Sequence, residues 1–180
     1  MIALLWLLGT AFLAVIIHIG AVLAIPTLAS DTAWQKLYAR LEPGKAEILP
    51  PVKPGQQVLD QMDPSMIVAV CRYDLAEGPL QLTLPKVAGY WSLSFVTPDK
   101  TTIYSVNDRT AGQPEAGIYA VSAQEAKRFY AELPDGEALP LVVEASADQG
   151  VAVYRLLADT ASLASVYRGL ASEFACTGSE

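Results

Sequence analysis

The chain has 180 residues, of which 12 are basic and 19 acidic, and its formal net charge is −7. All of these charged residues lie within residues 31–180, because the first thirty residues contain no Lys, Arg, Asp or Glu. An acidic body without a basic run argues against nucleic-acid binding, which needs a positive surface for phosphates. The length is sufficient for one domain with a sizeable core.

Residues 2–25 predict a single transmembrane helix, since all of them are apolar except Gly9, Thr10, His18 and Gly20. A helix of this length spans about 36 Å, which exceeds the ~30 Å hydrocarbon core of a bilayer. The alternative is a signal peptide cleaved at 27–29. However, the chain start has no basic region, and the apolar run is longer than a typical signal core. We therefore expect residues 1–29 to be an anchor that the mature protein keeps, with Pro26 ending or kinking the helix.

His18 is the only histidine of the chain and lies inside this span. An ionisable group at membrane depth is a candidate functional residue. The alternative is a neutral imidazole that hydrogen-bonds to a neighbouring helix or reaches an interface. Both interpretations predict a partner membrane protein.

Two features of the sequence predict opposite orientations of the anchor. Lys36, Arg40 and Lys45 follow the span and favour a cytoplasmic body. Long domains can translocate regardless of such charges, and a cysteine pair favours an oxidising compartment. We expect a single-pass protein of the bacterial inner membrane with a periplasmic body.

Residues 30–60 predict a short helix and a Pro-rich connecting loop before the body at 61–180. Asp31 can cap the helix. Its apolar face then carries Trp34, Leu37, Tyr38 and Leu41. Residues 43–60 contain four prolines and two glycines, which is typical of a loop.

The clearest strand pattern of the body lies at 90–109. Trp91, Leu93 and Phe95 alternate with more polar residues, which predicts a half-buried strand. Residues 97–100 predict a type I turn around Pro98, and residues 102–107 return as a second strand. We expect the β body to be built around this hairpin.

The other elements complete an α+β fold, in which the anchor precedes a mainly antiparallel β domain with two or three short helices. Residues 66–84 predict a second hairpin, and 118–121, 139–145 and 151–157 predict further strands. The pair Ser122 and Glu125 forms a capping box that opens a helix to about residue 133. Asp159 is expected to cap a last helix with an apolar stripe of Leu163, Val166, Tyr167, Leu170 and Phe174.

The sequence contains no nucleotide-binding, zinc-protease, EF-hand or nucleophile-elbow motif. Its body also lacks histidine, which excludes Ser-His-Asp and Cys-His catalysis and most zinc sites. We therefore expect no metal and no cofactor.

The cysteines Cys71 and Cys176 are either two buried thiols or one disulfide. Cys71 lies on the apolar face of the 66–75 strand. Cys176 is expected at the end of the last helix, whose stripe must dock on the sheet. We therefore predict that the two form a disulfide.

A candidate binding site consists of Asn107, Asp108 and Arg109 with Tyr104 nearby. Arg109 could hold a carboxylate or phosphate through two parallel hydrogen bonds. In the alternative, which we expect, Asn107 and Asp108 satisfy backbone amides of the following loop and Arg109 pairs with an acid. A second polar pair, at 72 and 74, is interpreted as the solvated face of a strand.

Several short motifs carry a resemblance to a known family. They are Tyr73-Asp74-Leu75, Gly78-Pro79-Leu80, Leu84-Pro85, Tyr90-Trp91-Ser92 and Asn107-Asp108-Arg109-Thr110-Ala111-Gly112. In this order they resemble the bacterial family called domain of unknown function 1254, over about residues 60–158. The resemblance implies an antiparallel β body in the bacterial envelope. Larger members carry a companion domain after this one, so the sequence looks like the short, membrane-anchored form. No established activity comes with the family.

These observations favour a non-catalytic subunit or binding module of a membrane-associated assembly, with a partner membrane protein that could carry the companion domain. The alternative is an envelope hydrolase or ligand-binding enzyme that uses Asp108 and Arg109. A deep pocket with converging polar groups at 104–112 would favour the enzyme. A flat apolar patch would favour the interaction module.

Overall fold

The protein is described from a computed structural model, in which residues 2–28, 33–53, 55, 58–59, 62–98, 101–111, 117–132 and 140–178 are placed. The chain divides into two compact units, Met1–Thr32 and Ala33–Glu180.

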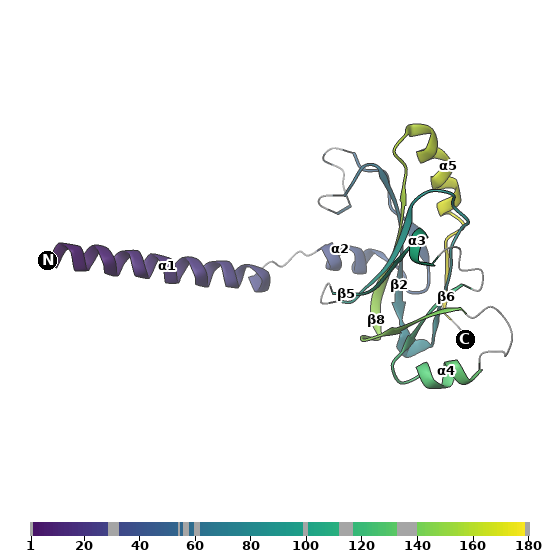
Figure 1. Ribbon diagram of the computed structural model, residues 1–180, viewed down its shortest axis with the longest axis horizontal. Helices are drawn as coiled ribbons and strands as arrows, with labels where there is room; N and C mark the ends of the chain where they lie inside the picture. The colour runs from purple at the N-terminus through teal and green to yellow at the C-terminus, as the bar shows by residue number, and fades with distance from the viewer. Residues whose placement is uncertain are drawn as a thin grey trace. The chain divides into compact units, whose positions relative to one another are not determined.

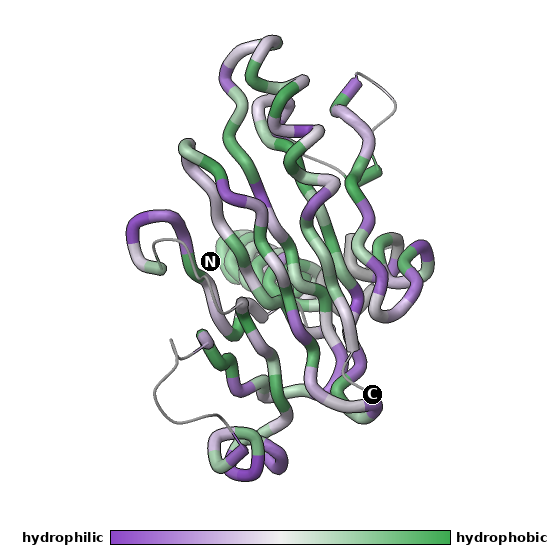
Figure 2. Tube along the Cα trace, turned by 90° about the vertical axis from the view of Figure 1, so that its right-hand side faces the viewer, coloured by the Kyte–Doolittle hydropathy of each residue, from purple (hydrophilic) through white to green (hydrophobic). Residues whose placement is uncertain are grey.

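The described residues of the first unit form a single helix, α1 (Ile2–Leu28). Its segment Ile2–Ile25 is long and apolar enough to span a membrane, and none of the segment is buried. Figure 2 shows this helix end-on and colours it green, as apolar, in contrast to the mixed colouring of the strands. The helix passes through Pro26, where we expected it to end or kink. A proline this close to the end of a helix removes only one backbone hydrogen bond.

A five-stranded antiparallel sheet forms the larger part of the second unit (Figure 1). Its strand order is β1 (Ala46–Ile48), β2 (Met66–Asp74), β8 (Gln149–Leu157), β4 (Trp91–Val96) and β5 (Thr102–Asn107). The predicted 90–109 hairpin is confirmed as β4 and β5, with a bulge between Phe95 and Val96. It lies at one edge of the sheet, whereas β8 is the central strand that pairs with both β2 and β4. The expected turn at 97–100 includes residues outside those described.

A four-stranded sheet has the order β7 (Leu141–Ala145), β6 (Ile118–Ser122), β3 (Leu80–Thr83) and β9 (Ala175–Gly178). Strands β6 and β7 are parallel because the chain crosses between them through α4 (Ala126–Glu132). The capping-box hydrogen bond precedes this helix, from the Glu125 amide to Ser122 Oγ at 3.3 Å. The domain is therefore α+β and mainly antiparallel, as predicted.

The predicted hairpin over 66–84 is wrong, because β2 and β3 belong to different sheets. Asp74 caps a short helix, η1 (Leu75–Glu77), by accepting a hydrogen bond from the Ala76 amide. Gly78 follows with φ of 127°, a backbone conformation that other residues rarely adopt. This connection carries the chain from one sheet to the other instead of folding it back on β2.

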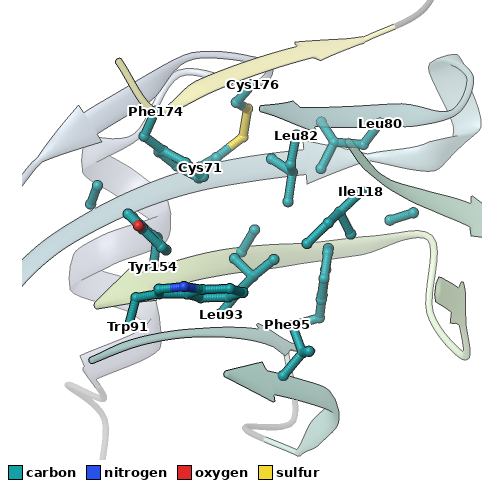
Figure 3. Packing of buried hydrophobic residues seen from close by; sticks show 14 of the residues in the cluster. Cys71, Leu80, Leu82, Trp91, Leu93, Phe95, Ile118, Tyr154, Phe174 and Cys176 are labelled. Carbon is teal, nitrogen blue, oxygen red and sulfur yellow. A yellow bond between two sulfur atoms is a disulfide. The ribbon is translucent and has the colours of Figure 1, made fainter. Parts of the chain in front are cut away.

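The main core fills the space between the two sheets (Figure 3). From the five-stranded sheet it takes the side chains that alternate inward, which include Trp91, Leu93, Phe95, Cys71 and Tyr154. From the other sheet it takes Leu80, Leu82, Ile118 and Cys176, among others. The alternation that predicted the hairpin thus reflects real burial on one face of β4.

A smaller apolar cluster covers part of the opposite face of the five-stranded sheet, which we call the outer face. Here α2 (Ala33–Arg40) places Leu37 over the sheet, and Leu41 and Leu49 follow it. Beneath them lie Val70 of β2 and two valines of β8. The expected helix is confirmed, although its Asp31 cap lies outside the described residues. The expected 43–60 loop also contains strand β1, which pairs with β2.

The last helix, α5 (Ala161–Ala171), differs from its prediction in cap and face. Thr160, not Asp159, is the N-cap, and its side chain accepts from the Leu163 amide. Leu163 and Val166 are exposed, whereas Tyr167 and Ala171 are buried. Ala164 and Ala171 let one narrow side of the helix approach the core. Leu163 and Val166 of the predicted apolar stripe therefore face solvent.

Candidate functional site

Asn107 closes the end of β5 and caps α3 (Asp108–Ala111). Its Oδ1 accepts hydrogen bonds from the backbone amides of Arg109 at 3.0 Å and Thr110 at 3.2 Å. In return, Thr110 Oγ1 accepts from the Asn107 amide at 3.0 Å. This reciprocal pattern is that of a capping residue, so Asn107 holds the start of the loop.

The other members of the predicted site do not converge with it. Tyr104 shares the inward face of β5 with Val106 and packs against the main core, whereas Asn107 belongs to the outer face. Arg109 is exposed, and no ion pair or side-chain hydrogen bond joins it to another described residue. Asp108 is half-buried, and its Oδ1 has no hydrogen-bond partner within the described part of the chain.

The outer face of the β4–β5 hairpin carries a different polar group, which we call the polar strip: Ser92, Ser94, Ser105 and Arg155. The register places Arg155 of β8 opposite Ser92, and Ser94 opposite Ser105. Arg155 Nη1 donates to Ser94 Oγ at 3.4 Å, and Ser94 Oγ lies 3.1 Å from Ser105 Oγ. Ser94 is buried, Ser92 and Arg155 are half-buried, and Ser105 is exposed.

The polar strip could not be found by sequence reasoning. The serines on one face of the 90–96 strand were visible, but nothing local shows that β8 pairs with β4. Only that pairing brings Arg155, distant in sequence, beside Ser92 and Ser94.

The electrostatics of the strip centre on Arg155. Burial lowers the pKa of the Arg155 guanidinium below its ordinary value, and the nearby Tyr90 acts in the opposite direction. Arginine remains charged at neutral pH under such shifts. No carboxylate of the described residues lies within ion-pair distance of it. The strip therefore presents one positive charge and several hydrogen-bond donors.

A second polar network lies at the other end of the outer face, where it ties α2 to the sheet. The Arg72 guanidinium lies 3.6 Å from the centroid of the Tyr38 ring. Tyr38 donates to Gln149 Oε1 at 2.9 Å, and Gln149 Nε2 donates to Asp74 Oδ2 at 2.7 Å. The interpretation of 72 and 74 as a solvated face is therefore wrong for Arg72, which lies beneath α2 in a structural role.

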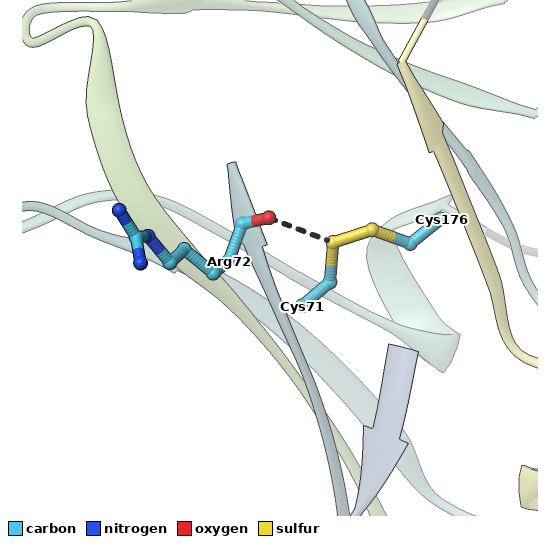
Figure 4. Close-up of a disulfide and its surroundings, with 3 residues drawn as sticks. All are labelled: Cys71, Arg72 and Cys176. Carbon is cyan, nitrogen blue, oxygen red and sulfur yellow. Dashed lines mark hydrogen bonds between the residues drawn. A yellow bond between two sulfur atoms is a disulfide. The ribbon is translucent and has the colours of Figure 1, made fainter. Parts of the chain in front are cut away.

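The disulfide Cys71–Cys176 is present and joins β2 of one sheet to β9 of the other, with Cα atoms 6.3 Å apart. Figure 4 shows Cys71 and Arg72 pointing to opposite sides of β2, with Cys71 Sγ 3.4 Å from the Arg72 carbonyl oxygen. Cys176 lies in a strand and not at a helix end, so the predicted bond is right and its structural reason is corrected.

Two further features bear on the chemistry that the body could perform. An open hollow of about 300 Å³ lies between the ends of two turns and is lined by Thr97, Pro98, Thr101, Ser146 and Ala147. It contains none of the predicted site residues. Among the described residues, no group of three or more His, Cys, Asp or Glu side chains is placed to hold a metal ion.

An apolar N-terminal helix and a two-sheet domain closed by a disulfide define the class of protein. The chain belongs to the family described as "Protein of unknown function (DUF1254)", which matches residues 46–178. The match includes β1 and β9, and so extends beyond the 60–158 region of the sequence resemblance. No curated protein matches the chain.

Two solved structures are similar to the chain. The VPA0106 protein from Vibrio parahaemolyticus has a TM-score of 0.57 and 12% identity, over 81% of this chain and 34% of that one. An uncharacterised protein from Burkholderia cenocepacia has a TM-score of 0.40 and 15% identity, over 73% of this chain and 34% of that one. The chain thus spans about a third of the length of both. The likeness to the Vibrio parahaemolyticus protein shows the fold alone, because 12% identity does not carry a function over.

Proposed function

We propose that this protein is a membrane-anchored, non-catalytic binding subunit of a bacterial envelope assembly, with its body on the periplasmic side of the inner membrane. The observation that carries the proposal is the pairing of an apolar 24-residue span with a buried disulfide. Disulfides form and persist in oxidising compartments and are rare in the cytosol. An exported body attached to the membrane accounts for both features.

A partner helix is supported by His18, an ionisable side chain within the apolar segment. Leaving an imidazole against lipid is costly, so such residues face other helices or water-filled cavities. Thr10 is the natural comparison, because its Oγ1 donates to the Leu7 carbonyl of its own helix at 3.0 Å. In the anchor, Thr10 thus has a hydrogen-bond partner within its own helix, whereas a neighbouring helix could supply one for His18.

The test measures location and assembly separately. Alkaline phosphatase fused after Glu180 should be active, and the protein should resist extraction from membranes by carbonate. In mild neutral detergent the particle should be heavier than a monomer. His18→Leu should shift it toward the monomer, whereas Thr10→Val should not. An inactive fusion would contradict the periplasmic location. A monomer that His18→Leu leaves unchanged would contradict the assembly with a partner.

A ligand-binding enzyme that uses Asp108 and Arg109 is the second candidate. The observation in its favour is the buried Asp108 Oδ1, which has no partner among the described residues. Hydrolysis of p-nitrophenyl acetate or p-nitrophenyl phosphate that Asp108→Asn abolishes, with unchanged thermal stability, would support it. Equal background rates for the parent and Asp108→Asn would count against it.

A further inference from the structure

The polar strip combines a positive charge with hydrogen-bond donors that the described residues leave unused. Arginine has five N–H donors in a fixed planar fork. Within the described part of the chain, the single side-chain hydrogen bond of Arg155 is the one to Ser94. The body around it carries a net negative charge, yet no described carboxylate pairs with this guanidinium.

The hydrogen bonds of the strip form a chain in which Arg155 donates to Ser94 and Ser94 donates to Ser105. Ser94 accepts from Arg155, so one lone pair of its hydroxyl is occupied. We assign the 3.1 Å contact with Ser94 as donor and Ser105 as acceptor, because a hydroxyl polarised by a cation is the better donor. This assignment leaves the hydrogen of Ser105, which is exposed, free for an external acceptor.

The group that fits the strip is an acceptor with negative charge. A planar carboxylate matches the guanidinium fork and can accept two parallel hydrogen bonds from it. The charge of the anion distinguishes a carboxylate from a phosphate or a sulfate. One guanidinium balances a monoanion, whereas a phosphate or sulfate dianion would keep an uncompensated charge beside an acidic body.

We propose that Arg155 and Ser105 bind a carboxylate group, either of a small free ligand or of a partner's acidic side chain. The buried Ser94 links these two side chains through its hydrogen bonds, and Ser92 lies opposite Arg155. This inference rests on the binding role proposed above and names the chemistry that the body recognises. Tyr90, which comes directly before β4, is partly exposed.

The test follows the arginine side chains directly. The chain has six arginines, so ¹⁵N-arginine labelling of the full-length protein in neutral detergent gives six Nε–Hε signals. The Arg155 signal is the one that Arg155→Lys removes. Added acetate should shift it saturably, with a dissociation constant on the order of 1–10 mM for one shared ion pair. Ser105→Ala, at an exposed position, should weaken the binding several-fold without unfolding the protein.

Matched controls separate a site from a general salt effect. Arg128→Met removes one positive charge from an exposed i,i+4 pair with Glu132 and should leave the acetate response of Arg155 unchanged. Sulfate at equal ionic strength should bind at least tenfold more weakly. A blocked tripeptide with one glutamate distinguishes the two sources of the carboxylate. If the tripeptide binds more tightly than acetate, the carboxylate belongs to a partner's side chain. If it binds more weakly, the carboxylate belongs to a small free ligand.

The proposal is overturned if the Arg155 signal does not respond to acetate, or if it moves only in parallel with the Arg109 and Arg128 signals. This failure is distinct from failure of the proposed function, which depends on location and particle mass. A heavy, exported particle without an acetate response would retain the subunit role and discard the carboxylate site.

Discussion

Asn107 stabilises the start of α3 through two backbone amides, and its loss has a predictable cost. Asn107→Ala should lower the free energy of unfolding by about 0.5–2 kcal/mol, the usual effect of removing a capping side chain. Asn107→Asp keeps the acceptor and should recover most of this. Urea denaturation of the three proteins measures the difference.

Arg109 provides the contrast, since its side chain is exposed. Arg109→Ala should change stability by no more than about 0.5 kcal/mol, as surface substitutions usually do. A larger loss would show that Arg109, and not only Asn107, holds the loop. Loss of a ligand without loss of stability would instead support the predicted binding site.

Tyr73 gives the stability a dependence on alkaline pH. Burial raises its pKa from 10.0 to about 12. The unfolded chain therefore loses the phenolic proton first, and the native state becomes less stable as the pH rises from about 10 to 12, by at most about 1.4 kcal/mol per pH unit. Tyr73→Phe should reduce this slope, as measured by urea denaturation at several pH values.

The same substitution should be nearly neutral or slightly stabilising at pH 7, because the Tyr73 hydroxyl is buried without a partner among the described residues. Tyr130→Phe, which removes a hydroxyl at an exposed position, serves as the control. A loss of more than about 1 kcal/mol at pH 7 would mean that the hydroxyl does have a hydrogen-bond partner.

Sequence reasoning at the residue scale succeeded where chemistry is local. The expected amide contacts of Asn107 lie within three residues. Among the described residues, Asp108 Oδ1 has no partner and Arg109 has no ion pair, so these two parts of the expectation are not met. Arg155 was missed because its partner Ser94 lies 61 positions away in sequence. Strand pairing, which is set by the packing of the whole domain, decides such neighbours.

At the scale of elements, Gly150 and Tyr73 form a cross-strand pair between β8 and β2. A Cβ at Gly150 would lie 2.1 Å from the Tyr73 hydroxyl oxygen and 2.3 Å from the ring carbon that carries it. The ring is also in edge contact with Phe95, at 6.1 Å between centroids, so it has little room to move. Gly150→Ala should therefore destabilise the protein by about 1–3 kcal/mol or more.

Gly169 is the matched control for this prediction. It lies in α5, and a Cβ there would meet nothing within 4 Å. Gly169→Ala should stabilise the protein by about 0.5–1 kcal/mol, because alanine favours the helix. Thermal unfolding of both variants gives the comparison. Equal effects of the two substitutions would show that Tyr73 can leave its position freely.

It was easier to predict which residues form strands than to predict which strands pair with each other. The strands at 91–96 and 102–107 follow from alternation and a turn, and they pair as expected. The 66–84 hairpin failed because a Gly-Pro turn signal also fits a connection between sheets. Strand β9 was missed because its four residues show no clear period, and it exists through pairing with β3.

On the scale of the whole molecule, the sequence predicted an apolar anchor, an α+β body and the pairing of its cysteines. It did not predict two facing sheets, since sheet membership depends on contacts between distant strands. The α2 network covers one end of the outer face, and the partly exposed polar strip lies at the other end. This division, invisible in the sequence, assigns binding to the β4–β5 side.

The disulfide is the one covalent link between the two sheets, apart from the chain itself, in the part of the molecule that the structure describes. It joins residues 105 positions apart. In the chain-entropy model, a loop of this length stabilises the folded state by about 4–5 kcal/mol. The Cys71→Ala/Cys176→Ala double variant should lose stability of this order in urea denaturation, and reduction in urea should bring the parent to the same midpoint.

Burial adds a kinetic consequence, because Cys71 is 0% and Cys176 5% exposed. Under native conditions a water-soluble reductant should act only as fast as the protein opens, so the rate of thiol appearance should plateau as reductant is increased. Protein isolated from membranes in the presence of an alkylating agent should contain the Cys71–Cys176 bond intact. Two alkylated thiols in that sample would remove both the predicted stabilisation and the main support for an exported body.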